Sequence, residues 1–100
     1  MKQIRLFCAA GMSTSALVNK MRKAAAEQEL EYEINAYSVS EIETYGHDAD
    51  IVFLGPQVGY KLKAVQETLP EKHVEVIDFT TYGMMDGAKL IKKCREFFGD

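Results

Sequence analysis

Four apolar runs, each followed by a stretch with helical spacing, constrain the fold of this 100-residue chain more than any other feature. We expect the runs to be strands, and they extend from about Gln3 to Cys8, Tyr32 to Ser38, Asp50 to Leu54 and His73 to Asp78. Strands that alternate with helices need crossover connections, which favour a parallel sheet covered by helices on both faces. The sequence therefore predicts a single α/β domain of three layers with right-handed connections.

The order of the four strands follows from their patterns. The run from Ile51 to Leu54 is apolar on both faces, as in a central strand, whereas the runs around Tyr32 and Val74 alternate, as edge strands often do. We therefore predict the order 2-1-3-4, which opens a crevice at the carboxyl end of the first strand. Low-molecular-weight tyrosine phosphatases and flavodoxin-like proteins have folds similar to this one. Arg5 lies inside the first strand, and the pattern gives no reason for a charge there.

Apolar residues at helical spacing mark the faces that the helices should bury. One face of the first helix carries Leu17, Met21, Ala24 and Gln28. One face of a later helix carries Val58, Leu62, Val65 and Leu69. The last helix, from about Asp86 to Phe98, should offer to the core Leu90, Ile91, Cys94, Phe97 and Phe98.

The composition favours one compact domain that needs no cofactor or metal. Hydrophobic residues make up 47% of the chain, which has two prolines and no Gly/Ser-rich linker. No window approaches the ~20 apolar residues that span a bilayer, and no secretory signal pattern opens the chain, so we expect a cytoplasmic protein without membrane insertion. Two distant cysteines and two scattered histidines do not make a zinc-binding pattern.

The charge of the chain argues against nucleic acid as a partner. A net charge of −3 provides no basic footprint, and Lys20, Arg22 and Lys23 fit the solvated face of a helix. No long apolar edge or heptad pattern demands assembly. We therefore expect a monomer that meets its partners transiently.

The segment from Cys8 to Ser15 joins the end of the first strand to the start of the first helix. A helix start carries unpaired N–H groups and about half a positive charge, so it attracts anions. A cysteine beside such a start ionises more readily than an ordinary thiol, and we expect Cys8 to be acidic, exposed and nucleophilic. The candidate phosphate-binding residues after it are Ala9, Ala10, Gly11, Met12, Ser13, Thr14 and Ser15.

Three other interpretations of this segment stay open at this point. In the first interpretation, Cys8 is a small buried apolar residue, and Ser13 or Thr14 does no more than cap the first helix. A second is a cysteine phosphatase, because the segment resembles the loop of low-molecular-weight tyrosine phosphatases. That loop has an arginine six residues after the cysteine, where this chain has Thr14. A third is a non-enzymatic module that senses anions.

Further candidates follow the third and fourth strands and so should lie at the same edge of the sheet as Cys8. Gln57 and Tyr60 are possible contacts to a phosphoryl group or a partner, and so are Tyr82 and Asp86. Asp86 is also a good helix N-cap, and either Asp86 or Asp78 could serve a phosphatase as general acid.

Cys94 and the two histidines have simpler structural interpretations. Cys94 shares a helix face with Leu90 and Ile91, so we expect a packed, inert thiol. His47 and His73 have no triad-like neighbours, and we expect both at the surface. Met84 and Met85 could form an exposed apolar patch near the edge that carries Cys8.

Three segments together resemble the enzyme IIB component of the lactose/cellobiose/chitobiose class of bacterial sugar phosphotransferase systems. They are the segment from Cys8 to Ser15, the segment from Leu54 to Tyr60, and Val76 to Asp78 with the following Tyr82-Gly83 and Asp86-Gly87. The resemblance covers nearly the whole chain.

This resemblance implies a phosphotransferase that works through a phosphocysteine. Cys8 would accept a phosphoryl group from a phosphohistidine on an enzyme IIA partner, with phosphoenolpyruvate as the ultimate donor. It would then pass the group to a sugar held by the membrane component, enzyme IIC. A cellobiose-like β-disaccharide is the usual sugar of the family. The sequence shows no metal site, and we expect this domain to require no metal ion and no cofactor.

Overall fold

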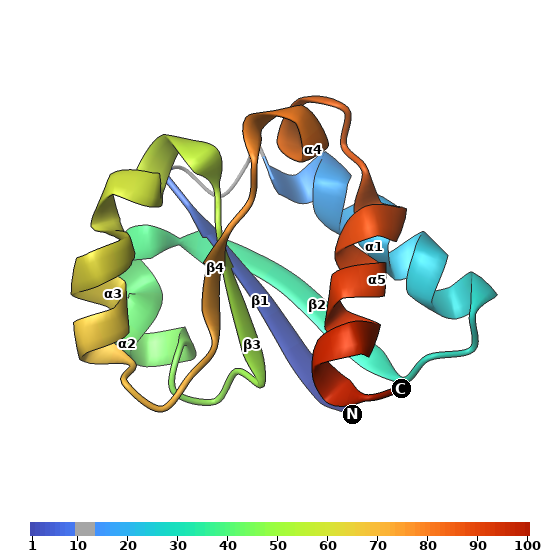
Figure 1. Cartoon of the computed structure of the whole chain (residues 1–100), viewed down its shortest axis with the longest axis horizontal. Coiled ribbons are helices and arrows are strands. Elements are labelled where there is room, and N and C mark those ends of the chain that lie inside the picture. The colour runs from blue at the N-terminus through green and yellow to red at the C-terminus, as the bar shows by residue number, and fades with distance from the viewer. Residues whose placement is uncertain (10–13) are drawn as a thin grey trace.

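The computed structural model describes residues 1–9 and 14–100 (Figure 1). Its sheet is built around a central strand that has a neighbouring strand on each side. The strands are β1 Lys2–Cys8, β2 Tyr32–Ser38, β3 Ile51–Leu54 and β4 Val74–Val76. The helices are α1 Ser15–Glu27, α2 Ile42–Tyr45, α3 Leu62–Thr68, α4 Phe79–Gly83 and α5 Gly87–Phe98. Two short 3-10 helices are η2 Val39–Glu41 and η3 Pro56–Lys61.

The four strands form one parallel sheet in the order β2-β1-β3-β4, as predicted. Cys8 lies opposite Ser38 of β2, and Phe7 lies opposite Leu54 of β3. β4 is shorter than the predicted run. It ends at Val76 because the chain turns into α4 two residues later, where Asp78 is the N-cap.

Helices cover both faces of the sheet, as predicted, and each face has its own core (Figure 1). Successive side chains of a strand point to opposite faces, so Ile4 and Leu6 of β1 join the core under α1 and α5. Phe7 joins the other core, which α3 and the η2–α2 segment close. The parallel connections therefore bury β1 and β3 on both faces.

Two predicted helix faces needed correction. Phe97 is 48% exposed, because its ring stacks on His73 at 4.6 Å while the ring of Phe98 packs edge-on against Tyr32 in the core. Gln28 is exposed because α1 ends one residue earlier. The predicted helix through Val58 is two segments, since a non-helical backbone at Val58 separates the start of η3 from α3.

Arg5 has partners on the α2 side of the sheet that the sequence pattern did not reveal. Its Nη1 donates to the carbonyl of Tyr45 at 2.5 Å. The guanidinium also lies 5.8 Å from the ring centroid of Tyr37 and 6.0 Å from that of Tyr45, and these two rings stack at 4.1 Å. Cation–π contacts and a charge-assisted hydrogen bond therefore offset the cost of placing a charge in a central strand.

Gly87 lets α5 approach α1 closely. A Cβ atom at this position would lie 2.5 Å from the backbone nitrogen of Met21 and 2.6 Å from the carbonyl carbon of Lys20. Both neighbours are backbone atoms of a helix, which cannot give way as a flexible side chain can. The packing of the first and last helices thus depends on a residue without a side chain.

We predict that Gly87→Ala lowers the free energy of unfolding by about 1–3 kcal/mol, the usual cost of forcing extra volume into a packed interface. Gly83→Ala is the matched control. A Cβ there meets nothing within 4 Å, and alanine favours the helix. Urea denaturation of both variants measures the difference. Equal stability of Gly87→Ala and wild type would show that α1 and α5 are not packed this closely.

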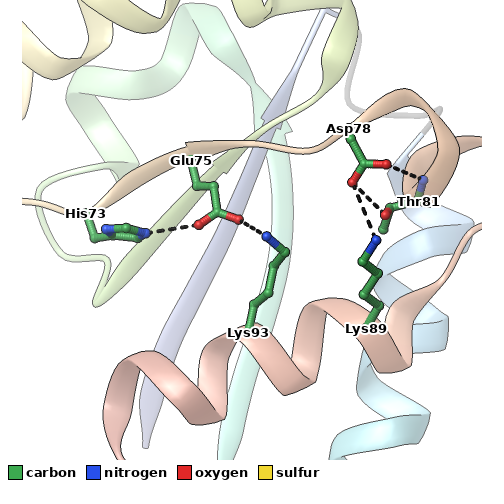
Figure 2. Close-up of polar contacts among 6 residues, drawn as sticks. All are labelled: His73, Glu75, Asp78, Thr81, Lys89 and Lys93. Carbon is green, nitrogen blue, oxygen red and sulfur yellow. Dashed lines mark hydrogen bonds and ion pairs between the residues drawn. The ribbon is translucent and has the colours of Figure 1, made fainter.

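A cluster of charges ties β4 to α5 (Figure 2). The Glu75 carboxylate accepts hydrogen bonds from Lys93 Nζ at 2.7 Å and from His73 Nε2 at 3.2 Å. Burial raises the pKa of Glu75, but the bonds from Lys93 and His73 outweigh that effect and leave the pKa below its usual value. The carboxylate therefore stabilises the fold in its charged form.

Because the pKa of Glu75 is lower in the folded chain, its contribution is present above the unfolded pKa and is lost as the pH falls through the folded pKa. We predict that Glu75→Gln costs about 0.5–1 kcal/mol at neutral pH, and that the cost fades below about pH 4. Glu67→Gln, on the exposed face of α3, is the control. Thermal unfolding across this pH range tests the pair, and a cost that does not vary with pH would contradict the prediction.

Candidate active site at the carboxyl end of β1

Cys8 is the last residue of the central strand and lies at the edge of the sheet where β1 gives way to α1. This is the edge at which the strand order predicts a crevice. The prediction of an exposed thiol is wrong, since Cys8 is fully buried. The reason is its position: β2 and β3 flank β1, and Thr14 at the start of α1 lies against the sulfur.

Thr14 brings the start of α1 to the cysteine. Its Oγ1 lies 3.3 Å from the Cys8 Sγ, and the side chain is fully buried. Ser13 and Thr14 were the two candidate caps of this helix. Thr14 occupies the N-cap position of α1 but its side chain makes no capping hydrogen bond to the described helix, and Ser13 lies outside the described residues. The hydroxyl lies against the sulfur instead.

The remaining residues of the predicted phosphate-binding segment divide into two groups. Ala9 and Ser15, which flank the site in the sequence, are exposed. The predictions for Ala10, Gly11, Met12 and Ser13 lie outside the described residues. The first turn of α1 contains no acidic residue, so no carboxylate there competes for an anion at the positive end of the helix.

The segment after β3 also reaches Cys8. The Gly55 amide donates to the carbonyl of Phe7 at 2.8 Å, and a Cβ at Gly55 would lie 3.3 Å from the Cys8 Cβ. Gln57 is exposed, and its Oε1 would also lie 3.3 Å from a Cβ atom at Gly55. The Gln57 side chain is therefore near Cys8. Tyr60 is 79% exposed. Gly55 lies in the segment that the sequence placed at this edge, but its close approach to Cys8 depends on packing that the sequence pattern does not reveal.

Structural roles account for three candidates after β4. Asp78 caps α4 by accepting hydrogen bonds from the Thr81 amide at 3.0 Å and its hydroxyl at 2.6 Å (Figure 2). Those bonds hold the pKa of Asp78 below its usual value, so it is ionised at neutral pH and unsuited to act as a general acid. Asp86 caps α5 through the Lys89 amide at 3.1 Å, as predicted. Tyr82 packs against the core under α1 and α5.

The remaining candidates are the two histidines, the Met84-Met85 pair and the second cysteine, Cys94. His47 and His73 are exposed, and so are Met84 at 72% and Met85 at 41%. Cys94 is fully buried in the core under α1 and α5, which confirms the prediction of a packed thiol. Burial, with a smaller contribution from the Glu75 carboxylate, raises the pKa of Cys94 to about 12.

We predict that the Cys94 thiol stays protonated at every pH at which the fold is stable. With cysteine labelled at Cβ by carbon-13, the Cys94 chemical shift should not change up to about pH 10, because the thiol titrates above that. The Cys8 signal serves as the comparison in the same sample. A Cys94 signal that titrates near neutral pH would mean that this thiol is not packed in the core.

Comparison with known proteins identifies the family. The family model described as "PTS system, Lactose/Cellobiose specific IIB subunit" matches residues 3–93, and the chain belongs to this family. The resemblance found in the sequence is thereby confirmed. Membership implies a phosphotransferase role in sugar transport, in a system that also has IIA and membrane IIC components.

Three relatives support this assignment. The galactose-specific EIIB component of Lactococcus lactis subsp. cremoris is 44% identical over 97 residues, and the match covers 90% of each chain. The cellobiose-specific EIIB component of Lactococcus lactis subsp. lactis is 43% identical over 97 residues, again with 90% of each chain covered. The oligo-beta-mannoside-specific EIIB component of Bacillus subtilis is 41% identical over 95 residues, which cover 93% of this chain and 92% of the relative.

Solved structures agree with the fold. The cellobiose-specific IIB component of Borrelia burgdorferi superposes with a TM-score of 0.76 at 33% identity, over 91% of this chain and 85% of that one. The lactose-specific IIB domain of Streptococcus pneumoniae gives a TM-score of 0.81 at 13% identity, over 92% and 95% of the two chains. At that identity the second likeness concerns the fold alone.

No group of three or more histidine, cysteine, aspartate or glutamate side chains in residues 1–9 and 14–100 is arranged to hold a metal ion. In the same part of the chain, no helix is long and apolar enough to cross a membrane.

Proposed function

We propose that Cys8 carries a phosphoryl group from a phosphohistidine on enzyme IIA to a sugar held by membrane enzyme IIC. The position of Cys8 carries this proposal: it ends the central strand, with its sulfur against Thr14, the N-cap residue of α1. A helix start stabilises both a thiolate and a bound phosphoryl group. The other elements of the proposal follow from membership in the IIB family.

Two in-line displacements make up the proposed reaction. In the first, the Cys8 thiolate attacks phosphorus, the S–P bond forms, and the N–P bond breaks with its electron pair returning to the imidazole of IIA. In the second, a sugar hydroxyl attacks, the O–P bond forms, and the S–P electron pair returns to sulfur while the hydroxyl proton passes to water. Such transfers need positioning and anion stabilisation more than further covalent machinery.

Anion stabilisation is assigned to residues 9–15, as the sequence predicted. Their backbone amides and hydroxyls would bind the phosphoryl oxygens, and each bond to a charged oxygen contributes about 1.5–3 kcal/mol. Gln57 is a candidate for the rim of this site, since it lies next to Gly55 and Cys8.

Exposed apolar side chains that follow β3 and β4 support a role with protein partners. Tyr60 follows β3, whereas Phe79 and Met84 follow β4, and they are 79%, 73% and 72% exposed. Exposed apolar groups favour transient docking of another protein. IIA and IIC would therefore approach the cytoplasmic IIB domain at these side chains, one after the other.

Two observations favour a carrier over a phosphatase. Thr14 stands where the phosphatase loop has an arginine, so the transferring phosphoryl lacks a guanidinium clamp from that position. Asp78 is held ionised by Thr81 and cannot donate a proton to a leaving group. A carrier gains from slow hydrolysis, because the phosphocysteine must last until the sugar arrives.

The names of the relatives bear on the sugar. Those relatives are specific for galactose, cellobiose and oligo-beta-mannoside. We therefore propose a β-linked disaccharide similar to cellobiose, which IIC and not this chain would select.

Phosphoenolpyruvate-driven phosphorylation through IIA tests the proposal. Wild-type protein should give a phosphorus NMR signal of a thiophosphate ester, and Cys8→Ser should give none. Cys94→Ala, which removes the packed thiol, is the matched control and should keep the signal. An unmodified Cys8 in the wild-type mixture would contradict the carrier.

The same samples separate the two alternatives. Steady turnover of p-nitrophenyl phosphate that depends on Cys8 would favour the phosphatase. Phosphate binding that survives in Cys8→Ser, without any phosphocysteine in the wild type, would favour an anion sensor.

A further inference from the structure

Thr14 carries a hydroxyl whose position is not explained by its place in the helix. A threonine at an N-cap usually accepts a hydrogen bond from an amide of the first turn. Thr14 makes no such capping bond, although its backbone occupies the N-cap position of α1. Its Oγ1 lies instead 3.3 Å from the Cys8 Sγ.

The contact is buried, which raises its importance. Cys8 and Thr14 are both fully buried, and a buried hydroxyl is costly unless it is hydrogen-bonded. A hydroxyl can rotate to donate, whereas a thiolate can only accept. Once Cys8 is ionised, the bond therefore runs from the threonine oxygen to the sulfur, and a bond to a charged acceptor is stronger than one between neutral groups.

The residues beside Cys8 in the sheet offer no charged alternative. Ser38 faces it from β2, and Gly55 packs against it after β3, and neither carries a charge. The first turn of α1, which follows Thr14, holds no acidic residue. Among these described neighbours, the hydroxyl of Thr14 and the positive end of α1 are the groups suited to stabilise a thiolate.

We propose that Thr14 is a catalytic hydrogen-bond donor to the Cys8 sulfur. It favours the thiolate that attacks phosphorus. In the transfer to the sugar, it stabilises the negative charge that returns to sulfur as the S–P bond breaks. The role in the two transfers rests on the proposed function, whereas the role in thiol ionisation does not.

This role differs from the binding of phosphoryl oxygens assigned to the segment as a whole. It requires the hydroxyl at the sulfur before any phosphate is present. The phosphatase loop has arginine at this position, so the change to threonine exchanges a phosphate clamp for a donor to the nucleophile. A phosphocysteine whose sulfur is a good leaving group is the expected consequence.

The test follows the Cys8 Cβ chemical shift against pH in unphosphorylated protein labelled with carbon-13. Thr14→Val, nearly identical in shape, should move the midpoint of the Cys8 titration upward by about one pH unit, which is a tenfold change in the ionisation equilibrium. Thr14→Ser, which keeps the hydroxyl, should stay within about 0.3 units of wild type. Thr81→Val removes the other buried threonine hydroxyl, at α4, and should leave the midpoint unchanged.

An unchanged midpoint in Thr14→Val would overturn the proposal and reduce Thr14 to a packing role. If Thr14→Val does not fold, as judged by its thermal unfolding, Thr14→Ala supplies the variant without a hydroxyl, and the same upward shift is required. The titration needs no IIA and no phosphate. If the midpoint shifts but the transfer experiment gives no phosphocysteine, only the carrier role is refuted. If phosphocysteine forms but the midpoint does not shift, only the role of Thr14 is refuted.

Discussion

The pairing of β1 with a parallel strand on each side is the constraint on which the rest of the structure depends. β2 pairs along the whole of β1, and β3 pairs with its second half. Since the two partners enter from opposite sides, the chain must cross over both faces of the sheet, and helices cover both. The same crossover places the end of β1, and thus Cys8, at the point where the connections diverge.

Burial on both faces dictates what β1 can contain. Ile4 and Leu6 fill one core and Phe7 the other, while the charge of Arg5 between them is stabilised by the stacked rings of Tyr37 and Tyr45 and by the Tyr45 carbonyl. Cys8 belongs to this buried strand and yet ends it. The sulfur is thus held by packing on the sheet side and meets the start of α1 on the other, a rigid setting for a nucleophile.

Much of the fold could be predicted because its signals are periodic. Apolar runs and helical spacing locate the strands and helices, and the fully apolar run from Ile51 to Leu54 identifies a central strand. Side-chain contacts between distant segments leave no such signal. The stacking of Phe97 on His73 and the partners of Arg5 depend on which loops meet in space, so periodicity could not reveal them.

The site was predictable in its location and less so in its details. Cys8 lies at the predicted edge, but a thiol at a strand end beside a helix start was expected to be exposed and is buried. Thr14 was one of two candidate caps because its side chain has that capacity, but its hydroxyl lies 3.3 Å from the Cys8 sulfur and makes no capping bond. Sequence shows which bonds a residue can make, and only the packing shows which it makes.

A pulse–chase experiment tests the carrier role most directly. Protein phosphorylated with radioactive phosphate through IIA is mixed with membranes that contain IIC, with and without the β-disaccharide, and quenched at short times. The carrier predicts that label leaves Cys8 for the sugar at the rate of overall sugar phosphorylation and stays on the protein when sugar is absent. Loss of the label to inorganic phosphate at the same rate with or without sugar would contradict it.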